Sequence, residues 1–268
     1  MKNFSFVKAE ALSNDFVIID DRSIGSISFS TNEIIRICDR RTGIGADGIL
    51  LLGPSDAGDF KMRTLNSDGS EAEMCGNGIR CAAAYVYASD AQALAAYTID
   101  TLAGLKNVRI IDDERGLIVS VDLGEPVFNN GTATINVDGR AIELTEVSMG
   151  NPHAVIFVED AAATQVETLG PVIETDKIFP DRTNVEFIQI AGNDLIIMRV
   201  WERGAGETAA CGTGAAAALA VASRAGKTGR KVTVRLSGGD LAVEWADDGH
   251  LFITGEANMV FAGTMGED

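Results

Sequence analysis

Two cysteines, Cys75 and Cys211, lie in copies of one short motif. Residues 71–78 and 207–214 both read E-x-x-x-C-G-x-G, and an alanine-rich segment follows each copy. The cysteines are 136 positions apart, close to half of the 268-residue chain. A strand candidate precedes each copy, so the pattern predicts an internal repeat that places one cysteine at the same point in each half.

The motif is typical of a helix start at which a thiol can exchange protons. A helix N-terminus has unpaired backbone N–H groups and partial positive charge. The glycine after each cysteine lets a ligand approach these amides closely, so we expect them to bind the α-carboxylate of an amino acid. The same field lowers the pKa of a cysteine from about 8.5 toward about 3.5–7.5. The amides concerned belong to Gly76, Asn77, Gly212 and Thr213.

Two such thiols on opposite faces of an α-carbon would invert its configuration without a cofactor. One cysteine, as thiolate, would remove the α-proton, and the other, as thiol, would donate a proton to the opposite face. The helix ends would stabilise the charge that develops on the carboxylate. Because their motifs repeat, we interpret Cys75 and Cys211 as catalytic, whereas we interpret Cys38 and Cys81 as small buried apolar residues.

Composition and charge exclude several classes of protein. The chain has 46% hydrophobic and 23% charged residues, as globular enzymes have. Its formal net charge is −17, which disfavours nucleic acid and anionic membranes as partners. No apolar run approaches the roughly 18 residues of a membrane span, and residues 1–16 do not read as a secretory signal, so we expect a cytoplasmic protein. With only two histidines and no CxxC pair, we expect no metal site.

The elements that must position the cysteines are mainly short strands. Helices are expected at Thr31–Arg40, with Thr31 as the N-cap, and after each of the two cysteines. Strands flanking a few helices favour an α+β fold. Strands are predicted at residues 17–20, 49–52, 60–65, 97–102, 108–111, 117–121, 142–147, 154–158, 185–190, 195–200, 231–236, 241–245, 251–254 and 259–262.

A boundary near residues 124–126, which read GEP, divides the chain into two related domains. The first half spans residues 1–122 and carries Cys75, and the second spans 123–258 and carries Cys211. We expect the C-terminal strand, within residues 259–268, to return to the first half.

A glycine motif at residues 43–48, GIGADG, matches the G-x-G-x-x-G fingerprint of dinucleotide-binding proteins. That fingerprint requires a strand before the glycines and a helix after them. Here a helix candidate precedes the motif and a strand candidate follows it. The order is reversed, and we therefore reject a dinucleotide site.

Further motifs accompany the two cysteine motifs in order along the chain, and together they resemble the diaminopimelate epimerase family. The resemblance implies two pseudo-symmetric α/β-roll domains, each a mixed, mostly antiparallel sheet wrapped around a central helix. It also implies a homodimer and no cofactor. The matching segments are 13–16 (SNDF), 43–48 (GIGADG), 66–70 (NSDGS), 74–81 (MCGNGIRC), 101–104 (TLAG), 150–153 (GNPH), 182–185 (RTNV), 201–208 (WERGAGET) and 210–218 (ACGTGAAAA).

The resemblance further implies a reaction and a set of roles. The reaction is the interconversion of L,L-2,6-diaminopimelate and its meso form, a step of lysine and peptidoglycan precursor biosynthesis. Cys75 and Cys211 would be the base and the acid, and Asn14 and Glu202 would hold the α-amino group at the reacting end. The distal amino-acid end would be held by Asn66, Asn151, Asn184 and Arg203.

Several of these assignments keep an alternative. His153 and Glu202 could assist thiol deprotonation, but His153 could equally be a partnered structural histidine. The four asparagines could individually be turn or cap residues. The chain also departs from the family: residues 10–13 read EALS where a His-Gly-x-Gly segment is common, and Gly48 stands where some members have glutamine.

Two other functions are compatible with the motifs. One is a related two-cysteine racemase acting on proline, hydroxyproline or histidine. Arg203 and the asparagines favour a substrate with a charged distal end, which argues against proline. The other is a non-catalytic module that keeps the cysteines for packing or for amino-acid sensing.

Overall fold

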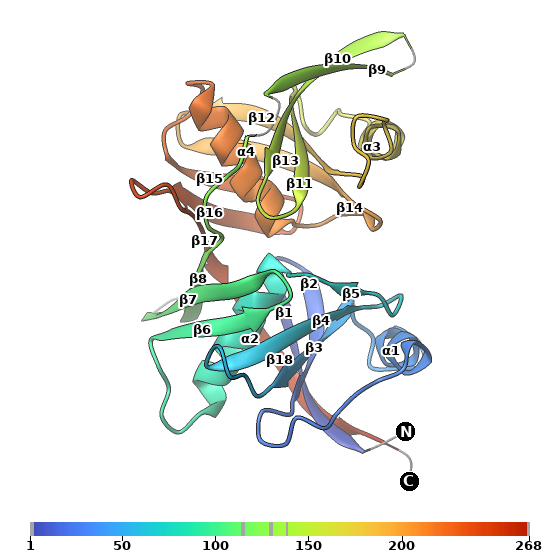
Figure 1. Ribbon diagram of the computed structural model, residues 1–268, viewed down its shortest axis with the longest axis vertical. Helices are drawn as coiled ribbons and strands as arrows, with labels where there is room; N and C mark the ends of the chain where they lie inside the picture. Colours follow the sequence, from blue (N-terminus) through green and yellow to red (C-terminus); the bar gives the residue numbers. More distant parts are fainter. Residues whose placement is uncertain (1–2, 114–115, 129–130, 138, 267–268) are drawn as a thin grey trace. The chain divides into compact units, whose positions relative to one another are not determined.

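The chain folds into two compact units, made of residues 1–121 with 255–268 and of residues 122–254. The structure is a computed structural model, and it describes residues 3–113, 116–128, 131–137 and 139–266. Within these residues each unit contains two helices and a sheet (Figure 1). None of the described helices has the length and apolar character needed to cross a membrane.

The sheet of the first unit has neighbouring strands in the order β18-β1-β2-β3-β4-β6-β7-β8. The pairs β2–β3 and β4–β6 are parallel, and the other pairs are antiparallel. The elements are β1 (Phe4–Ala11), β2 (Asn14–Asp20), α1 (Thr31–Cys38), β3 (Gly48–Gly53), β4 (Phe60–Asn66), β5 (Glu71–Ala72), α2 (Gly76–Ser89), β6 (Ala96–Thr101), β7 (Gly104–Asp113), β8 (Gly116–Asp122) and β18 (Asn258–Met265).

The second unit repeats this arrangement, in the order β9-β10-β11-β12-β13-β15-β16-β17. Again two pairs are parallel, β11–β12 and β13–β15, and they stand at the same places in the order. The elements are β9 (Thr132–Val137), β10 (Arg140–Ser148), β11 (Pro152–Phe157), α3 (Val166–Glu174), β12 (Asn184–Gly192), β13 (Leu195–Glu202), β14 (Gly206–Thr208), α4 (Gly212–Arg224), β15 (Lys231–Leu236), β16 (Gly239–Trp245) and β17 (Leu251–Glu256).

One alanine-rich helix in each unit packs inside the sheet. Helix α2 contacts six strands of its unit, among them β1, β3 and β18, and α4 contacts β10 to β13, β15 and β16. Alanine and glycine leave these helices thin, so the sheet can surround them on several sides, and most of their residues are buried. The predicted fold of two pseudo-symmetric rolls around central helices is confirmed.

The first helix shows one error in the sequence prediction. Helix α1 begins at Thr31 as expected, but its N-cap is Ser30 and not Thr31. The Ser30 hydroxyl accepts a hydrogen bond from the Glu33 amide, and the Glu33 carboxylate accepts one from the Ser30 amide at 2.8 Å. This reciprocal pair satisfies two helix-end donors, which Thr31 cannot do from inside the helix.

The two cysteines without a motif are packed in cores. Cys38 is 4% exposed beside Ile34 and Ile37 in the first unit, and Cys81 is fully buried. Burial raises the pKa of Cys38 to about 11, and it raises that of Cys81 further. Both are therefore protonated at neutral pH, and the prediction that they are small buried apolar residues is confirmed.

Candidate active site

Cys75 is the N-cap of α2. Its backbone is extended, its carbonyl accepts from the amide of Ile79 at 2.8 Å, and its Sγ accepts from the amide of Gly78 at 3.4 Å. A Cβ at Gly78 would lie 2.9 Å from Leu50 of β3, so glycine is needed for this close packing. The amides of Gly76 and Asn77 lie in the same first turn, where helix geometry provides no intrahelical acceptor.

Hydrogen bonds connect Cys75 to polar side chains of its own unit. The Cys75 thiol donates to Asn14 Oδ1 at 3.7 Å, and Asn77 Nδ2 donates to the same oxygen at 3.2 Å. Arg80, which is fully buried, donates from Nη2 to Asn77 Oδ1 at 2.9 Å, while its Nε and Nη1 have no hydrogen-bond partner in the described residues. Burial lowers the pKa of Arg80 and the nearby thiols Cys81 and Cys75 oppose that shift. A buried cation and a helix N-terminus thus both lie close to Cys75.

Cys211 is the N-cap of α4 and has the same main-chain geometry. Its Sγ accepts from the amide of Gly214 at 3.4 Å and lies 3.5 Å from the hydroxyl of Thr213. The pKa of Cys211 is raised well above its usual value, first by burial and then by the negative charges of Glu202 and Glu186. The prediction that the helix end lowers this pKa is wrong for Cys211, because burial and two carboxylates outweigh the field of the helix.

A chain of hydrogen bonds leads from Cys211 into the core of the second unit. Asn151 Nδ2 donates to the Thr213 hydroxyl at 3.3 Å, and Asn151 Oδ1 accepts from His153 Nε2 at 3.0 Å. His153 Nδ1 lies 2.7 Å from Glu186 Oε1, and both of these side chains are buried. His153 is therefore a partnered histidine that also connects through Asn151 and Thr213 to the thiol of Cys211.

Glu202, at the end of β13, is the carboxylate whose charge acts most strongly on Cys211. It accepts from the Thr208 hydroxyl at 2.5 Å, and the thiol of Cys211 donates to it. Burial raises the pKa of Glu202, whereas the hydrogen bonds from Thr208 and Cys211 lower it, and the net direction is upward. A carboxyl group with a raised pKa beside a thiol can exchange a proton with that thiol.

The remaining predicted residues lie at strand ends. Asn184 begins β12, where its Nδ2 donates to the carbonyl of Pro152 at 2.9 Å and its Oδ1 accepts from the Arg203 amide at 2.9 Å. Its carboxamide therefore fixes the segment that carries Arg203, whose exposed guanidinium donates to the Asp181 carbonyl at 3.3 Å. Asn66 ends β4 and donates to the Ser70 hydroxyl at 3.0 Å.

The predicted residues thus fall into two groups, one in each unit. The first unit brings Cys75, Asn14 and Asn77 into one cluster, with Asn66 at a strand end opposite Gly48. A glutamine, which some family members have at this position, would not fit at Gly48, because a Cβ there would lie 2.7 Å from the Leu65 carbonyl oxygen. The second unit connects Cys211, Thr213, Asn151, His153 and Glu202, with Asn184 and Arg203 beside them in the fold.

Three residues of these clusters were not predicted from the sequence: Arg80, Glu186 and Asp47, whose carboxylate accepts from Asn14 Nδ2 at 2.8 Å. Two of them carried a signal, because Glu186 is a charge inside an apolar strand and Arg80 is a charge inside an alanine-rich helix. A buried charge needs a partner or a function. Asp47 carried none of its own, since it is one residue of a glycine-rich loop.

The fold defines the class of protein first. It matches the crystal structure of a phenazine biosynthesis protein of the PhzF family from Bacillus anthracis, with a TM-score of 0.76 at 17% identity over 99% of both chains. At that identity the likeness concerns the fold alone, a pair of pseudo-symmetric α+β units.

The family follows from the sequence. The profile of diaminopimelate epimerase matches residues 6–129 and 145–260. The diaminopimelate epimerase of Synechococcus elongatus is 45% identical over 98% of both chains, and that of Desulfitobacterium hafniense is likewise 45% identical over 98% of both. The chain belongs to the diaminopimelate epimerase family.

Proposed function

We propose that this protein is an isomerase that interconverts L,L-2,6-diaminopimelate and meso-diaminopimelate without pyridoxal phosphate. Family membership supports the substrate and the reaction. The observation that carries the proposal is the paired geometry of Cys75 and Cys211. Each is the N-cap of a central helix, at the same place in a repeated unit, with its Sγ against main-chain amides.

In the proposed mechanism the α-carbon is bound between the two thiols. One cysteine removes the α-proton as thiolate while the other donates a proton as thiol, and their roles exchange in the reverse direction. The first-turn amides of both helices hold the α-carboxylate and stabilise the charge that develops on it. These amides are those of Gly76, Asn77, Gly212 and Thr213.

The other polar residues bind the two ends of the substrate. Asn14 and Glu202 hold the α-ammonium at the reacting carbon, and Glu202 also takes the proton of Cys211, to which it is hydrogen-bonded. His153 assists indirectly, by holding Asn151. The distal carboxylate pairs with the exposed guanidinium of Arg203, with the distal end oriented by Asn66, Asn151 and Asn184.

The wider setting is also a proposal. We place the enzyme in the cytoplasm, in lysine and peptidoglycan precursor biosynthesis, and take residues 1–122 with 259–268 and residues 123–258 as its two halves. A homodimer is supported by the apolar side chains of Val260 and Phe261 on β18, which are 57% and 49% exposed.

Exchange of the substrate α-proton with solvent tests the function directly. In D₂O the wild type should incorporate deuterium at the α-position of diaminopimelate, measured by mass spectrometry. Cys75→Ala and Cys211→Ala should each lower the epimerisation rate by at least about 10²–10⁴-fold, because each loses its acid–base group. Cys38→Ala is the matched control, a buried thiol without a helix-cap position, and should keep the wild-type rate.

The same assay separates the alternatives. A preference for proline, hydroxyproline or histidine over diaminopimelate would replace the proposed substrate. Unchanged turnover in either Cys75→Ala or Cys211→Ala would refute the two-thiol mechanism. Absence of exchange on the whole amino-acid panel would favour a non-catalytic binding module.

A further inference from the structure

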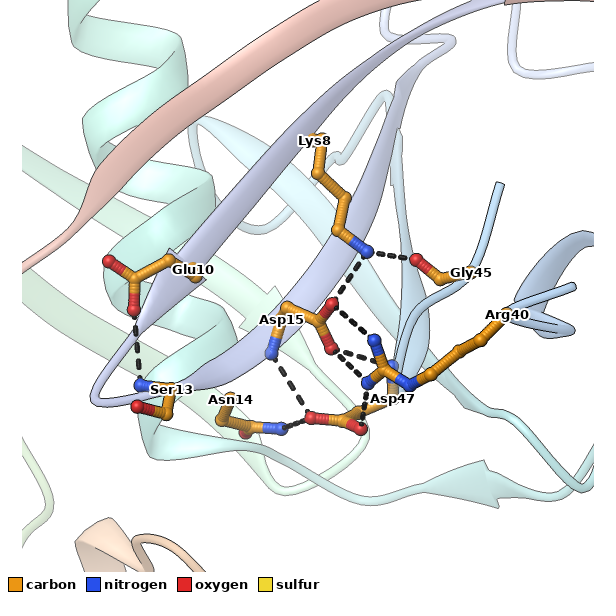
Figure 2. Close-up of polar contacts among 8 residues, drawn as sticks. All are labelled: Lys8, Glu10, Ser13, Asn14, Asp15, Arg40, Gly45 and Asp47. Carbon is orange, nitrogen blue, oxygen red and sulfur yellow. Dashed lines mark hydrogen bonds and ion pairs between the residues drawn. The ribbon is translucent and has the colours of Figure 1, made fainter. Parts of the chain in front are cut away.

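The glycine-rich loop at residues 43–48 contacts the cluster formed by Cys75, Asn14 and Asn77. Asp47, between α1 and β3, is the residue that makes this contact (Figure 2). Its Oδ2 accepts from Asn14 Nδ2 at 2.8 Å and from the amide of Asp15 at 3.1 Å. Its Oδ1 accepts from Arg40 at 2.7 Å. One carboxylate therefore connects the side chain of Asn14 to a network of ion pairs.

The network fixes the position of the Asp47 carboxylate. Arg40 also donates to both oxygens of Asp15, at 2.9 and 2.7 Å, and Lys8 lies 2.7 Å from Asp15. Lys8 is 7% exposed and donates as well to the carbonyl of Gly45 in the glycine loop. The amide of Asp47 in turn donates to Asp15 at 3.1 Å. Two cations and two carboxylates thus hold the loop against β1 and β2.

Both oxygens of Asp47 accept from N–H donors, Oδ1 from Arg40 and Oδ2 from the amide of Asp15, and the Asp15 carboxylate is ionised at neutral pH. Burial alone would raise the pKa of Asp15, but the hydrogen bonds and charges of Arg40 and Lys8 lower it well below its usual value. An ionised carboxylate has acceptors and no donor. Asp47 Oδ2, which already accepts from the Asp15 amide, is likewise an acceptor toward Asn14, so Asn14 turns its donor toward it.

This requirement sets the orientation of the Asn14 carboxamide. Because its NH₂ group must face Asp47, its oxygen must face the opposite way, and that oxygen accepts from the Cys75 thiol and from Asn77 Nδ2. An oxygen acceptor suits an ammonium group, whereas an NH₂ group at that place would repel it.

We propose that Asp47 is a positioning residue that locks the Asn14 carboxamide with its oxygen beside Cys75, so that the site selects an α-ammonium group. The proposal deepens the proposed function, on which it rests, because it assigns the recognition of the amine to a loop outside the cysteine motifs. Asp47 itself does not touch the substrate.

Asp47→Asn tests the orientation with little change in shape. Arg40 would hold the oxygen of the new amide, so that its NH₂ group faces Asn14 and forces the Asn14 carboxamide to rotate. We expect kcat/KM for diaminopimelate to fall about 10–100-fold, the range for a lost hydrogen bond to a charged group, and mainly through KM.

The alkylation of Cys75 gives a readout that does not depend on turnover. In the wild type Asn14 Oδ1 accepts from the thiol, whereas in Asp47→Asn the rotated NH₂ group would donate to the thiolate. The pH profile of Cys75 alkylation by iodoacetamide, followed by peptide mass spectrometry, should therefore move to lower pH in the variant. A loop that only supports the fold would leave this profile in place.

Two further variants complete the test. Asp39→Asn is the matched control, because the hydrogen bonds that Asp39 accepts in the described residues come from Arg41 and Thr42 of the same segment and not from Asn14. It should leave KM and the alkylation profile unchanged. The double variant Asp47→Asn with Asn14→Asp exchanges donor and acceptor and again presents an oxygen to Cys75. It should be more active than either single variant.

The outcomes separate this proposal from the proposed function. Wild-type KM and alkylation profile in Asp47→Asn would overturn the positioning role. If Asp47→Asn does not fold, a double variant that is no more active than Asn14→Asp alone would overturn it. If the wild type exchanges no α-proton of diaminopimelate, the proposed function fails, and the shift of the alkylation profile alone then decides the orientation of Asn14.

Discussion

The two units share one topology, but they place different charged residues near their cysteines. Behind Cys75 lie two asparagines and the buried guanidinium of Arg80. Around Cys211 lie the carboxylates of Glu202 and Glu186, which raise the pKa of the thiol. The second site therefore disfavours the thiolate, whereas a buried cation lies near the cysteine of the first site.

Strand register identifies the positions at which the units differ. Phe16 pairs with Gly48 between β2 and β3, as His153 pairs with Asn184 between β11 and β12. Two residues further along β3 and β12 stand Leu50 and Glu186. The glycines of the two helices confirm the match, because a Cβ at Gly78 would meet Leu50 and a Cβ at Gly214 would meet Glu186.

The apolar pair Phe16 and Leu50 is therefore replaced in the second unit by the buried pair His153 and Glu186. The asparagine beside each cysteine is also held by a different kind of partner in each unit. Asn14 is oriented by the Asp47 carboxylate, and Asn151 by His153. The comparison teaches that the repeat keeps the backbone of the site, while a few buried substitutions change which charged groups lie near each thiol.

Converting the polar pair to the apolar pair should give the largest effect on stability. Glu186→Leu leaves His153 buried without its partner, and the free energy of unfolding should fall by about 3–5 kcal/mol. Adding His153→Phe recreates the arrangement of the first unit, and well-packed apolar pairs often replace buried ion pairs without loss. Urea denaturation should therefore show that the double variant regains most of the lost stability.

Activity should not return with stability in that double variant. Without His153, Asn151 loses the donor that holds it, and the chain of hydrogen bonds to Cys211 is broken. A double variant that turns over at the wild-type rate would show that the polar pair has no part in the reaction. A double variant as unstable as Glu186→Leu would contradict the equivalence of the two positions.

Removing the charge of Glu202, at the end of β13, should have an intermediate effect, which is on the pKa of Cys211. Glu202 ends β13 at the position that Asn66 occupies at the end of β4. Glu202→Gln removes a negative charge beside Cys211, so the pKa of this thiol should fall toward its usual value. Alkylation of Cys211 at a fixed alkaline pH should become several-fold faster, while alkylation of Cys75, measured in the same sample, should not change.

The same variant predicts a change in the pH dependence of stability. Because the pKa of Cys211 is raised on folding, the associated stabilisation is fully present below the unfolded value of about 8.5. It is lost as the pH rises through the folded value. Glu202→Gln should therefore lose less stability than the wild type between neutral and alkaline pH in urea denaturation. An equal or larger loss would show that Glu202 does not contribute to the raised pKa of Cys211.

The sequence predicted the repeated parts of the molecule better than the parts that differ. The two Cys-Gly-x-Gly helix starts are local patterns, so they identified where α2 and α4 begin. Helix α3 was missed because Gly170 and Pro171 are poor helix formers; glycine is required there, since a Cβ would lie 2.4 Å from the Trp201 ring. Strand β1 was missed because its alternating pattern contains Lys8, whose charge is buried against Asp15.

Contacts between distant residues explain what the sequence could not show at the site. Asn14 and Asp47 are 33 positions apart and meet only because β2 and β3 are parallel neighbours. Likewise, the raised pKa of Cys211 depends on Glu186 and Glu202, which come from two other strands. A helix-start motif indicates the positive field at the end of its own helix. It does not indicate which charged residues the rest of the fold places beside the cysteine.

The smallest effect is expected where the units are alike. Arg63 and Glu71 form a two-pronged ion pair between β4 and β5, and Arg199 and Glu207 form the same pair between β13 and β14. The first pair is partly exposed, so Arg63→Met should reduce the free energy of unfolding by about 0.2–1 kcal/mol. Arg199 also donates to the carbonyl of Thr164 at 2.7 Å, and Arg199→Met should therefore have a larger effect, about 1–2 kcal/mol. Urea denaturation of both variants measures the difference, and equal losses would mean that the added carbonyl contact contributes nothing. Since the hydrogen bonds of both arginines go to glutamates and main-chain carbonyls, both variants should keep the wild-type alkylation rates of Cys75 and Cys211.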